Sequence, residues 1–239
     1  MARTVHVIDP DFDTVIVLTN PATKFAGKIY SKFRPDEGEE VFSVLKADDQ
    51  VPPAAATAED GDEDGDEDGE GDEDGEGDED EEEVHYHVSS RHLQIASPRF
   101  RTALAKERWV ESNMVNGRYE LSTYDWDEEA FLVILNIVHL RNKKVPKTVS
   151  LEMLAKVGVL VDYYDCGEAL EMFTTMWIGQ IIKTALPHTI CRDLVLWVWV
   201  AWVFDLQEQF ETATYVAIKQ GKRAMITLGL PIPDSVTGR

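Results

Sequence analysis

The sequence predicts an α+β fold, in which a small sheet is capped by helices and followed by an all-helical extension. Short β-branched segments gather in the first half of the chain, and helical apolar spacing dominates after residue 89. One long acidic segment interrupts the strands. With 239 residues, 44% of them hydrophobic, the chain can bury a substantial core.

The negative charge of the chain is concentrated in one acidic tract, residues 59–83. It contains 19 Asp or Glu and six Gly, and without these 19 charges the net charge of −22 falls to −3. Such a composition buries too little apolar surface to offset the entropy of ordering. We therefore expect a disordered acidic insertion at 47–83.

Two interpretations of the acidic tract stay open. It is either a solvated linker or a docking strip for basic proteins such as histones or ribosomal proteins. A calcium-loop spacing begins at Asp60, but Glu67 and Gly71 stand where such a loop needs an apolar residue and a closing Glu. Nucleic acid is not an expected partner, because phosphate repels the tract.

Strands are expected before and directly after the insertion. The segments 13–18 (DTVIVL) and 41–45 (VFSVL) are rich in β-branched or aromatic residues, and 84–88 (VHYHV) alternates. A further short strand is expected at 118–122. The stretch 25–33 between the first two segments leaves the number of opening strands at two or three.

Helix starts are marked by polar caps. Ser97-Pro98 predicts a helix at 98–106, because Ser caps free amides and Pro fits the first helical position. A capping box at Asp125-x-x-Glu128 begins the next helix, and Ser150 begins another that ends near Cys166. The remainder predicts only helices, at 168–182, 190–204 and 206–220.

Three segments, in the same order, resemble BTB/POZ domains. They are YHVSSRHLQIASPRFRTAL (86–104), RYELSTYDWDEEAFLVILNIVHL (118–140) and VSLEMLAKVGVLVDYYDC (149–166). The resemblance implies a BTB/POZ-like domain at 13–166, interrupted by the insertion at 47–83. The following helical extension, 167–225, is similar to the tail of many fungal members.

The sequence departs from the family pattern in two places. Ser89 stands where many animal members have His. Only 12 residues precede Asp13, so the N-terminal helix and strand that many members exchange between subunits are not expected. Dimerisation by that exchange is therefore not expected either.

Trp109, Val110 and Glu111 form the candidate partner-binding site. Members that join cullin-type ubiquitin ligases carry a bulky apolar residue, any residue and Glu at the corresponding place. An exposed Trp beside a carboxylate combines a large buried area with a charge-assisted contact. The alternative is a Trp that simply packs in a surface loop.

Other candidate sites have structural alternatives. His85 and His87 could share a strand face as a metal pair, but an exposed strand face without metal is the preferred interpretation. Trp199 and Trp202 are expected to share one face of a helix while Trp197 points elsewhere, and they form either core or a partner groove.

The sequence indicates neither catalysis nor secretion. No nucleophile elbow, P-loop or dinucleotide fingerprint occurs, so no enzyme activity and no cofactor are expected. Cys166 and Cys191 suit small core positions in a reducing compartment. The most apolar run, 194–204, is about half of a bilayer span and predicts a buried helix. An intracellular protein, nuclear or cytoplasmic, is expected.

Three roles stay open at this point. The chain is an assembly scaffold that binds another BTB chain or a different protein, an adaptor for a cullin-type ubiquitin ligase, or an acidic chaperone-like protein. In the third role the acidic tract binds basic proteins and the folded part only positions it.

Overall fold

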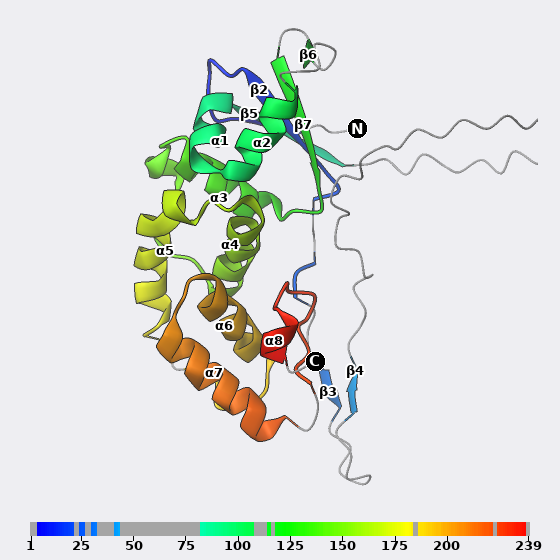
Figure 1. Ribbon diagram of the computed structural model, residues 1–239, viewed down its shortest axis with the longest axis vertical. Helices are drawn as coiled ribbons and strands as arrows, with labels where there is room; N and C mark the ends of the chain where they lie inside the picture. Colours follow the sequence, from blue (N-terminus) through cyan, green and yellow to red (C-terminus); the bar gives the residue numbers. More distant parts are fainter. Residues whose placement is uncertain are drawn as a thin grey trace, which may run out of the picture.

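The molecule has a mixed sheet at one end and a column of helices extending from it (Figure 1). The computed structural model describes residues 4–21, 24–26, 30–32, 41–43, 82–107, 114–115, 118–183, 186–221 and 224–237. This arrangement confirms the predicted α+β class.

Five strands form the main sheet, in the order β1-β5-β2-β7-β6. β1 lies parallel to β5 and β2 parallel to β7, whereas the β2–β5 and β6–β7 pairs are antiparallel. A separate antiparallel pair is formed by β3 and β4. The strands span Thr4–Val7 (β1), Thr14–Thr19 (β2), Tyr30–Lys32 (β3), Val41–Ser43 (β4), Glu83–Val88 (β5), Met114–Val115 (β6) and Arg118–Tyr124 (β7).

β1 corrects the expectation that no strand precedes Asp13. Its four residues are too few to show a period, and most of them are exposed. The strand is held by partners distant in the sequence: it pairs with β5, and the His6 ring lies 2.8 Å from the Glu128 carboxylate. Only the folded chain brings these groups together.

The acidic insertion ends earlier than expected. β5 begins at Glu83, and the carbonyl of Glu82 accepts a hydrogen bond from the Asn20 amide at 3.0 Å. Glu83 therefore belongs to the sheet, and Glu82 is bonded to the residue that follows β2. Residues 47–81 lie outside the described residues.

The helices match their expected positions to within about two residues. They are α1 (Ser90–Ala96), α2 (Pro98–Glu107), α3 (Glu128–Val138), α4 (Leu151–Tyr164), α5 (Gly167–Ile181), α6 (Arg192–Val203), α7 (Gln207–Gln220) and α8 (Asp234–Thr237), with a 3₁₀ helix at Asn142–Lys144. The segment with α8 was not expected, yet it buries Leu228, Leu230 and Ile232.

Two of the predicted caps are confirmed and one is wrong. Ser97 Oγ accepts from the Phe100 amide, and Ser150 Oγ accepts from the Met153 amide. The α3 cap is Asp127 and not Asp125, which adopts a left-handed φ of 59° in the preceding turn.

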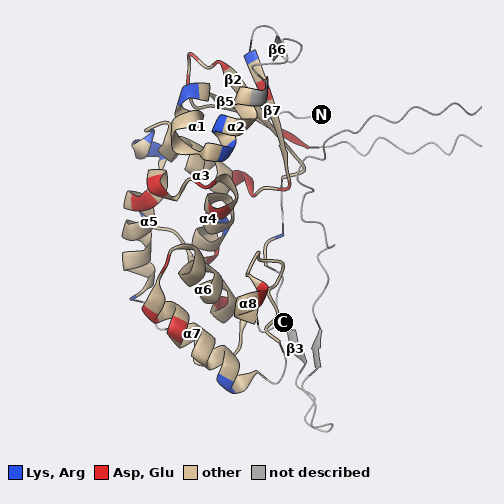
Figure 2. Ribbon diagram, viewed as in Figure 1, with Lys and Arg blue, Asp and Glu red and all other residues tan. Residues whose placement is uncertain are grey.

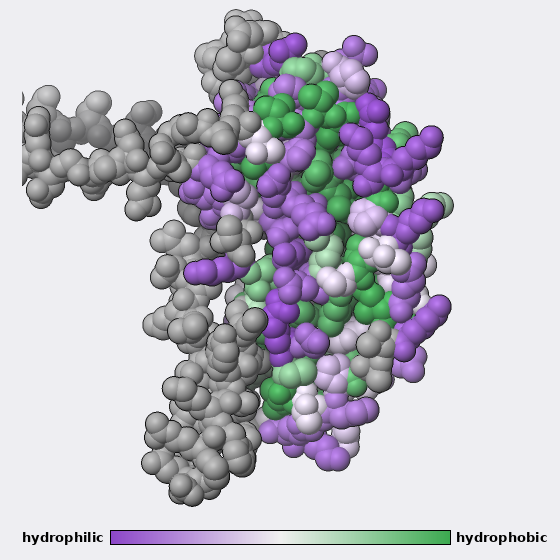
Figure 3. All heavy atoms as spheres, turned by 180° about the vertical axis from the view of Figure 1, so that it is seen from behind, coloured by the Kyte–Doolittle hydropathy of each residue, from purple (hydrophilic) through white to green (hydrophobic). Residues whose placement is uncertain are grey.

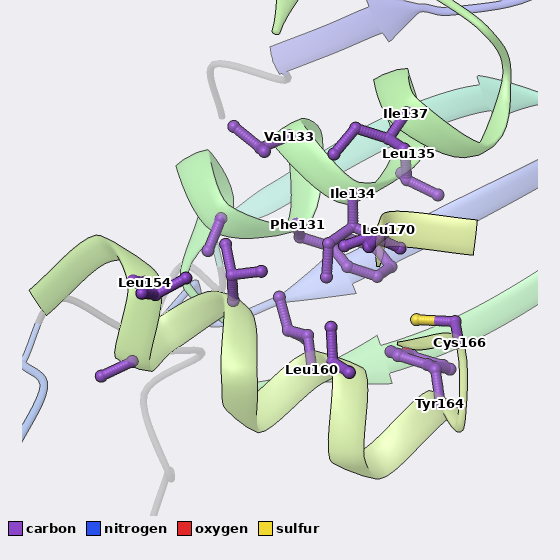
Figure 4. Close-up of a cluster of buried hydrophobic side chains, with 14 of the residues drawn as sticks. Phe131, Val133, Ile134, Leu135, Ile137, Leu154, Leu160, Tyr164, Cys166 and Leu170 are labelled. Carbon is purple, nitrogen blue, oxygen red and sulfur yellow. The ribbon is translucent and has the colours of Figure 1, made fainter. Parts of the chain in front are cut away.

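The core lies between the sheet and helices α3, α4 and α5. Figure 4 shows side chains from these three helices gathered in one cluster, with Phe131 near its centre. Cys166 is buried at its edge, and burial raises the pKa of its thiol to about 12, so it is a core residue as predicted. Cys191 is only partly buried but packs against the core.

Helix α6 is buried on almost every side, which confirms the buried helix expected at 194–204. Trp199 donates from Nε1 to the Ala155 carbonyl at 3.1 Å, and the missing side chain of Gly158 leaves room for its indole. Trp197 is also buried, whereas Trp202 is partly exposed beside Phe210. Trp197 and Trp199 therefore belong to the core, as one of the two interpretations predicted, whereas Trp202 is exposed.

Asp13 joins the start of β2 to the start of α1. Its Oδ1 accepts from the Ser90 amide at 2.6 Å and its Oδ2 from the Ser90 hydroxyl at 2.5 Å, while Ser89, the local cap, makes no side-chain cap bond. Burial alone would raise the pKa of Asp13, but the bonds from Ser90 outweigh it, and the pKa is lowered. A cap from 77 residues away replaces the local one.

Core truncation on α1 should be far more damaging than truncation at its surface. Leu93 is 0% exposed and Ile95 is 71% exposed on the same short helix. We expect Leu93→Ala to cost about 2–5 kcal/mol of unfolding free energy and Ile95→Ala about 0.5 kcal/mol or less. Phe131→Ala should cost about 3–5 kcal/mol. Urea denaturation measures all three, and similar midpoints for Leu93→Ala and Ile95→Ala would contradict the core assignment.

Removing the Asp13 cap should destabilise the fold in a pH-dependent manner. We expect Asp13→Ala to cost about 0.5–2 kcal/mol, the usual range for a lost cap. Because the folded pKa lies below the ordinary value of 3.8, this contribution is complete above that pH and is lost as the pH falls through the folded pKa. Chemical denaturation from pH 7 to pH 3 tests this expectation. Asp11→Ala, an exposed carboxylate in the same loop, is the matched control and should leave stability unchanged.

Candidate interaction surface

The predicted partner-binding residues Trp109, Val110 and Glu111 lie outside the described residues. They occupy the connection between Glu107, the last residue of α2, and Met114, the first residue of β6. Both interpretations of Trp109, a partner anchor and a packed side chain, therefore stay predictions.

An aromatic surface lies at the opposite end of α2. It comprises Arg99 from the first turn of α2, Tyr124 from the end of β7, Trp126 from the turn that follows, and Tyr163 from α4. The rings of Trp126 and Tyr163 are 5.0 Å apart, and the Arg99 guanidinium lies 4.6 Å from the centre of the Tyr163 ring. Tyr124 is half exposed and Tyr163 is 39% exposed.

The adjacent residues Tyr163 and Tyr164 connect this surface to the core. Tyr164 is buried and stacks on Phe100, while Tyr163 turns outward with its ring edge-on to Tyr164 at 4.9 Å. On the other side, Trp126 donates from Nε1 to Thr123 Oγ1 at 2.6 Å. Tyr163 and Trp126 thus contact residues that are themselves packed in the structure.

The electrostatics of the aromatic surface favour an acidic partner group. Burial raises the pKa of the Asp162 carboxyl, and Asp165 raises it further, whereas Arg99 lowers it. Arg99 forms no ion pair with a described acid, so its guanidinium keeps donors for another molecule. Arg and Tyr are enriched among the side chains that dominate binding energy at interfaces.

The rest of the surface offers less organised features. From behind, hydrophobic patches reach the surface along the molecule but are broken by hydrophilic residues (Figure 3). No helix in the described part of the chain combines the length and the apolar character needed to span a membrane.

The two histidines of β5 are not an exposed pair. His85 is 3% exposed, with its Nε2 3.0 Å from the Glu83 carboxylate, and the His87 ring stacks on Phe12 at 3.9 Å. The predicted exposed strand face is therefore wrong for His85, whose side chain is buried beside Glu83. Among the described residues, no cluster of His, Cys, Asp and Glu has the makeup of a metal site.

Comparison with known proteins identifies no family: no protein-family model matches the chain, and no curated protein matches its sequence. Function must be inferred from the residues and their arrangement.

Proposed function

We propose that the chain is a protein–protein interaction module of the BTB/POZ type, which acts without catalysis and without a cofactor. The order of its elements carries this proposal. β5 leads into α1, the Ser97-Pro98 step opens α2, and β7, α3 and α4 follow. The same order of strand, helix, Ser-Pro step, helix, strand and two helices is implied by the resemblance in the sequence.

The aromatic surface supports a role in binding other proteins. Rigid rings bury a large area at a low entropic cost, because the core contacts of Tyr164 and Thr123 already restrict their neighbours Tyr163 and Trp126. Arg99 adds a charged donor beside them. This combination suits a partner that presents apolar groups next to a carboxylate.

Within this proposal, the segment after α2 distinguishes an adaptor for a cullin-type ligase from an assembly scaffold. Trp109 and Glu111 would provide an apolar anchor and a charge on one loop. An assembly scaffold would instead bind another BTB chain or a different protein through the described surface and would not need these two side chains.

The double variant Trp109→Ala with Glu111→Lys tests the adaptor role. A central aromatic anchor contributes about 2–4 kcal/mol, so we expect the affinity for the N-terminal domain of a cullin to fall by about 30- to 1,000-fold. Isothermal titration calorimetry with purified protein measures this change. Helical content by circular dichroism should stay the same.

The melting temperature is the control for this experiment. A buried Trp109 would lower it on substitution, whereas an exposed anchor would leave it nearly unchanged. No cullin binding by the intact chain, or equal binding by the double variant, would eliminate the adaptor role. The scaffold role then predicts that Tyr163→Ala weakens capture of partner proteins while Ile218→Ala, at an exposed position on α7, does not.

A further inference from the structure

A dense group of cations lies directly after α3. This basic loop, residues 141–147 (RNKKVPK), carries Arg141, Lys143, Lys144 and Lys147, and all four side chains are exposed. None of them forms an ion pair with a described acid. Figure 2 shows Lys and Arg on α1, on α2 and on the turn that follows α3. Four cations in seven residues form a local positive charge in a chain with a net charge of −22.

Three other cations at this end of the molecule lie against neighbouring groups of the chain. Arg99 lies over Tyr163, Arg118 lies over the Phe12 ring at 4.1 Å, and Arg101 donates to the Gln94 carbonyl at 3.1 Å. Arg91 on α1 is a single exposed cation. The basic loop, with four cations in seven residues, is the densest cationic group among them.

The backbone of the basic loop is held in place by α5. Trp177 donates from Nε1 to the Pro146 carbonyl at 2.9 Å, and Gln180 donates to the Lys147 carbonyl at 3.2 Å. The Val145 side chain is buried in the core. Because the backbone of the loop is already ordered, binding would restrict only the lysine and arginine side chains on the loop's side of the contact.

Leu140 marks one end of this loop with two unfavourable features. It adopts a left-handed φ of 57° at the end of α3, where Gly or Asn is preferred, and its side chain is 74% exposed. An exposed apolar side chain therefore lies beside the four cations.

We propose that the basic loop is the binding site for residues 59–81 of the same chain. In this segment 17 of the 23 residues are Asp or Glu, because the other two of the 19 acids, Glu82 and Glu83, lie directly before and in β5. The charges of the two segments are complementary. The proposal rests on the described loop and the composition of the tract, and it does not depend on the proposed BTB/POZ function.

The position of the loop relative to the tract makes this contact sterically accessible. The tract joins the sheet at the start of β5, and the Ser89 amide at the other end of β5 donates to His139 Nε2 at 2.9 Å, directly before the loop. Six strand residues span about 20 Å. For comparison, a chain of 23 residues with random-coil statistics has a root-mean-square length of about 25–30 Å.

Tethering makes the tract a strong competitor for the loop. An attached segment that matches the span has an effective concentration in the millimolar range. Other polyanions would have to displace it and would also be repelled by any part of the tract left free. The loop is thereby reserved for the chain's own acidic segment.

A peptide with the sequence of residues 59–81 tests the proposal directly. Fluorescence anisotropy would measure its binding to the intact chain and to a variant that lacks residues 59–81. We expect binding to the deletion variant, weakening as salt is raised, and at least about 10-fold weaker binding to the intact chain, whose own tract occupies the loop. Equal binding to both proteins would overturn the proposal.

Charge reversal within the deletion variant locates the site. Lys143→Glu with Lys144→Glu should abolish peptide binding. The control is Lys183→Glu with Lys219→Glu, which changes the net charge by the same amount. Both lysines are exposed, one just after α5 and one on α7, and this variant should retain binding. Equal losses in the two double variants would mean general charge attraction and would overturn a defined site. Tighter binding of a single-stranded DNA oligonucleotide than of the peptide would also overturn it.

Cross-linking in the intact chain covers the case in which the deletion variant does not fold. A carbodiimide that couples amines to carboxylates should join Lys143, Lys144 or Lys147 to residues 59–81 within one molecule at low protein concentration. Cross-links distributed equally over Lys183 and Lys219 would contradict the proposed contact.

Discussion

Phe131 is the ring on which the packing of the sheet against the helices depends. The Tyr86 ring of β5 lies edge-on to it at 5.2 Å, and the Tyr164 ring of α4 lies 5.8 Å away. Tyr164 in turn stacks on Phe100 of α2 at 4.3 Å. This buried series of four rings joins β5, α3, α4 and α2. Because Tyr163 follows Tyr164 directly, the exposed aromatic surface is positioned by the same core.

A second set of contacts attaches the helical extension to the segment that leads into the acidic insertion. Arg192, at the start of α6, donates to the carbonyls of Phe25 and Ala26 and pairs with Glu152 of α4 at 2.8 Å. Lys156 pairs with Asp127, the α3 cap, at 2.6 Å. Burial alone would lower the Lys156 pKa, but Asp127 and Glu152 outweigh it and raise the pKa, so the ammonium stays charged. Phe25 and Ala26 are therefore bonded to α6, and the same Arg192 connects them to α4.

The sequence predicted what depends on neighbouring residues and missed what depends on distant ones. Ser97-Pro98 and Ser150 cap helices within three residues, so their patterns are visible in the sequence. β1 depends on β5, and the start of α1 depends on Asp13, 77 positions away. The aromatic surface likewise needs Arg99 and Tyr163, which no local spacing relates. The α3 cap was predicted only approximately. The sequence places Asp125 and Asp127 close to the helix start, and the backbone of the preceding turn makes Asp127 the residue that caps it.

Under the proposed contact, the acidic tract and the basic loop each affect how tightly the other binds other proteins. If the loop holds the tract at a millimolar effective concentration, a basic protein must compete with the loop for the same carboxylates. An acidic partner must likewise compete with the tract for Lys143 and Lys144. The affinity of either segment for another protein is then proportional to the fraction of molecules in which the tract and the loop are apart. Raised salt weakens the internal contact and the contacts with other proteins together. Binding of a basic protein to the tract would free the loop, so the two surfaces would be coupled without any change in the fold.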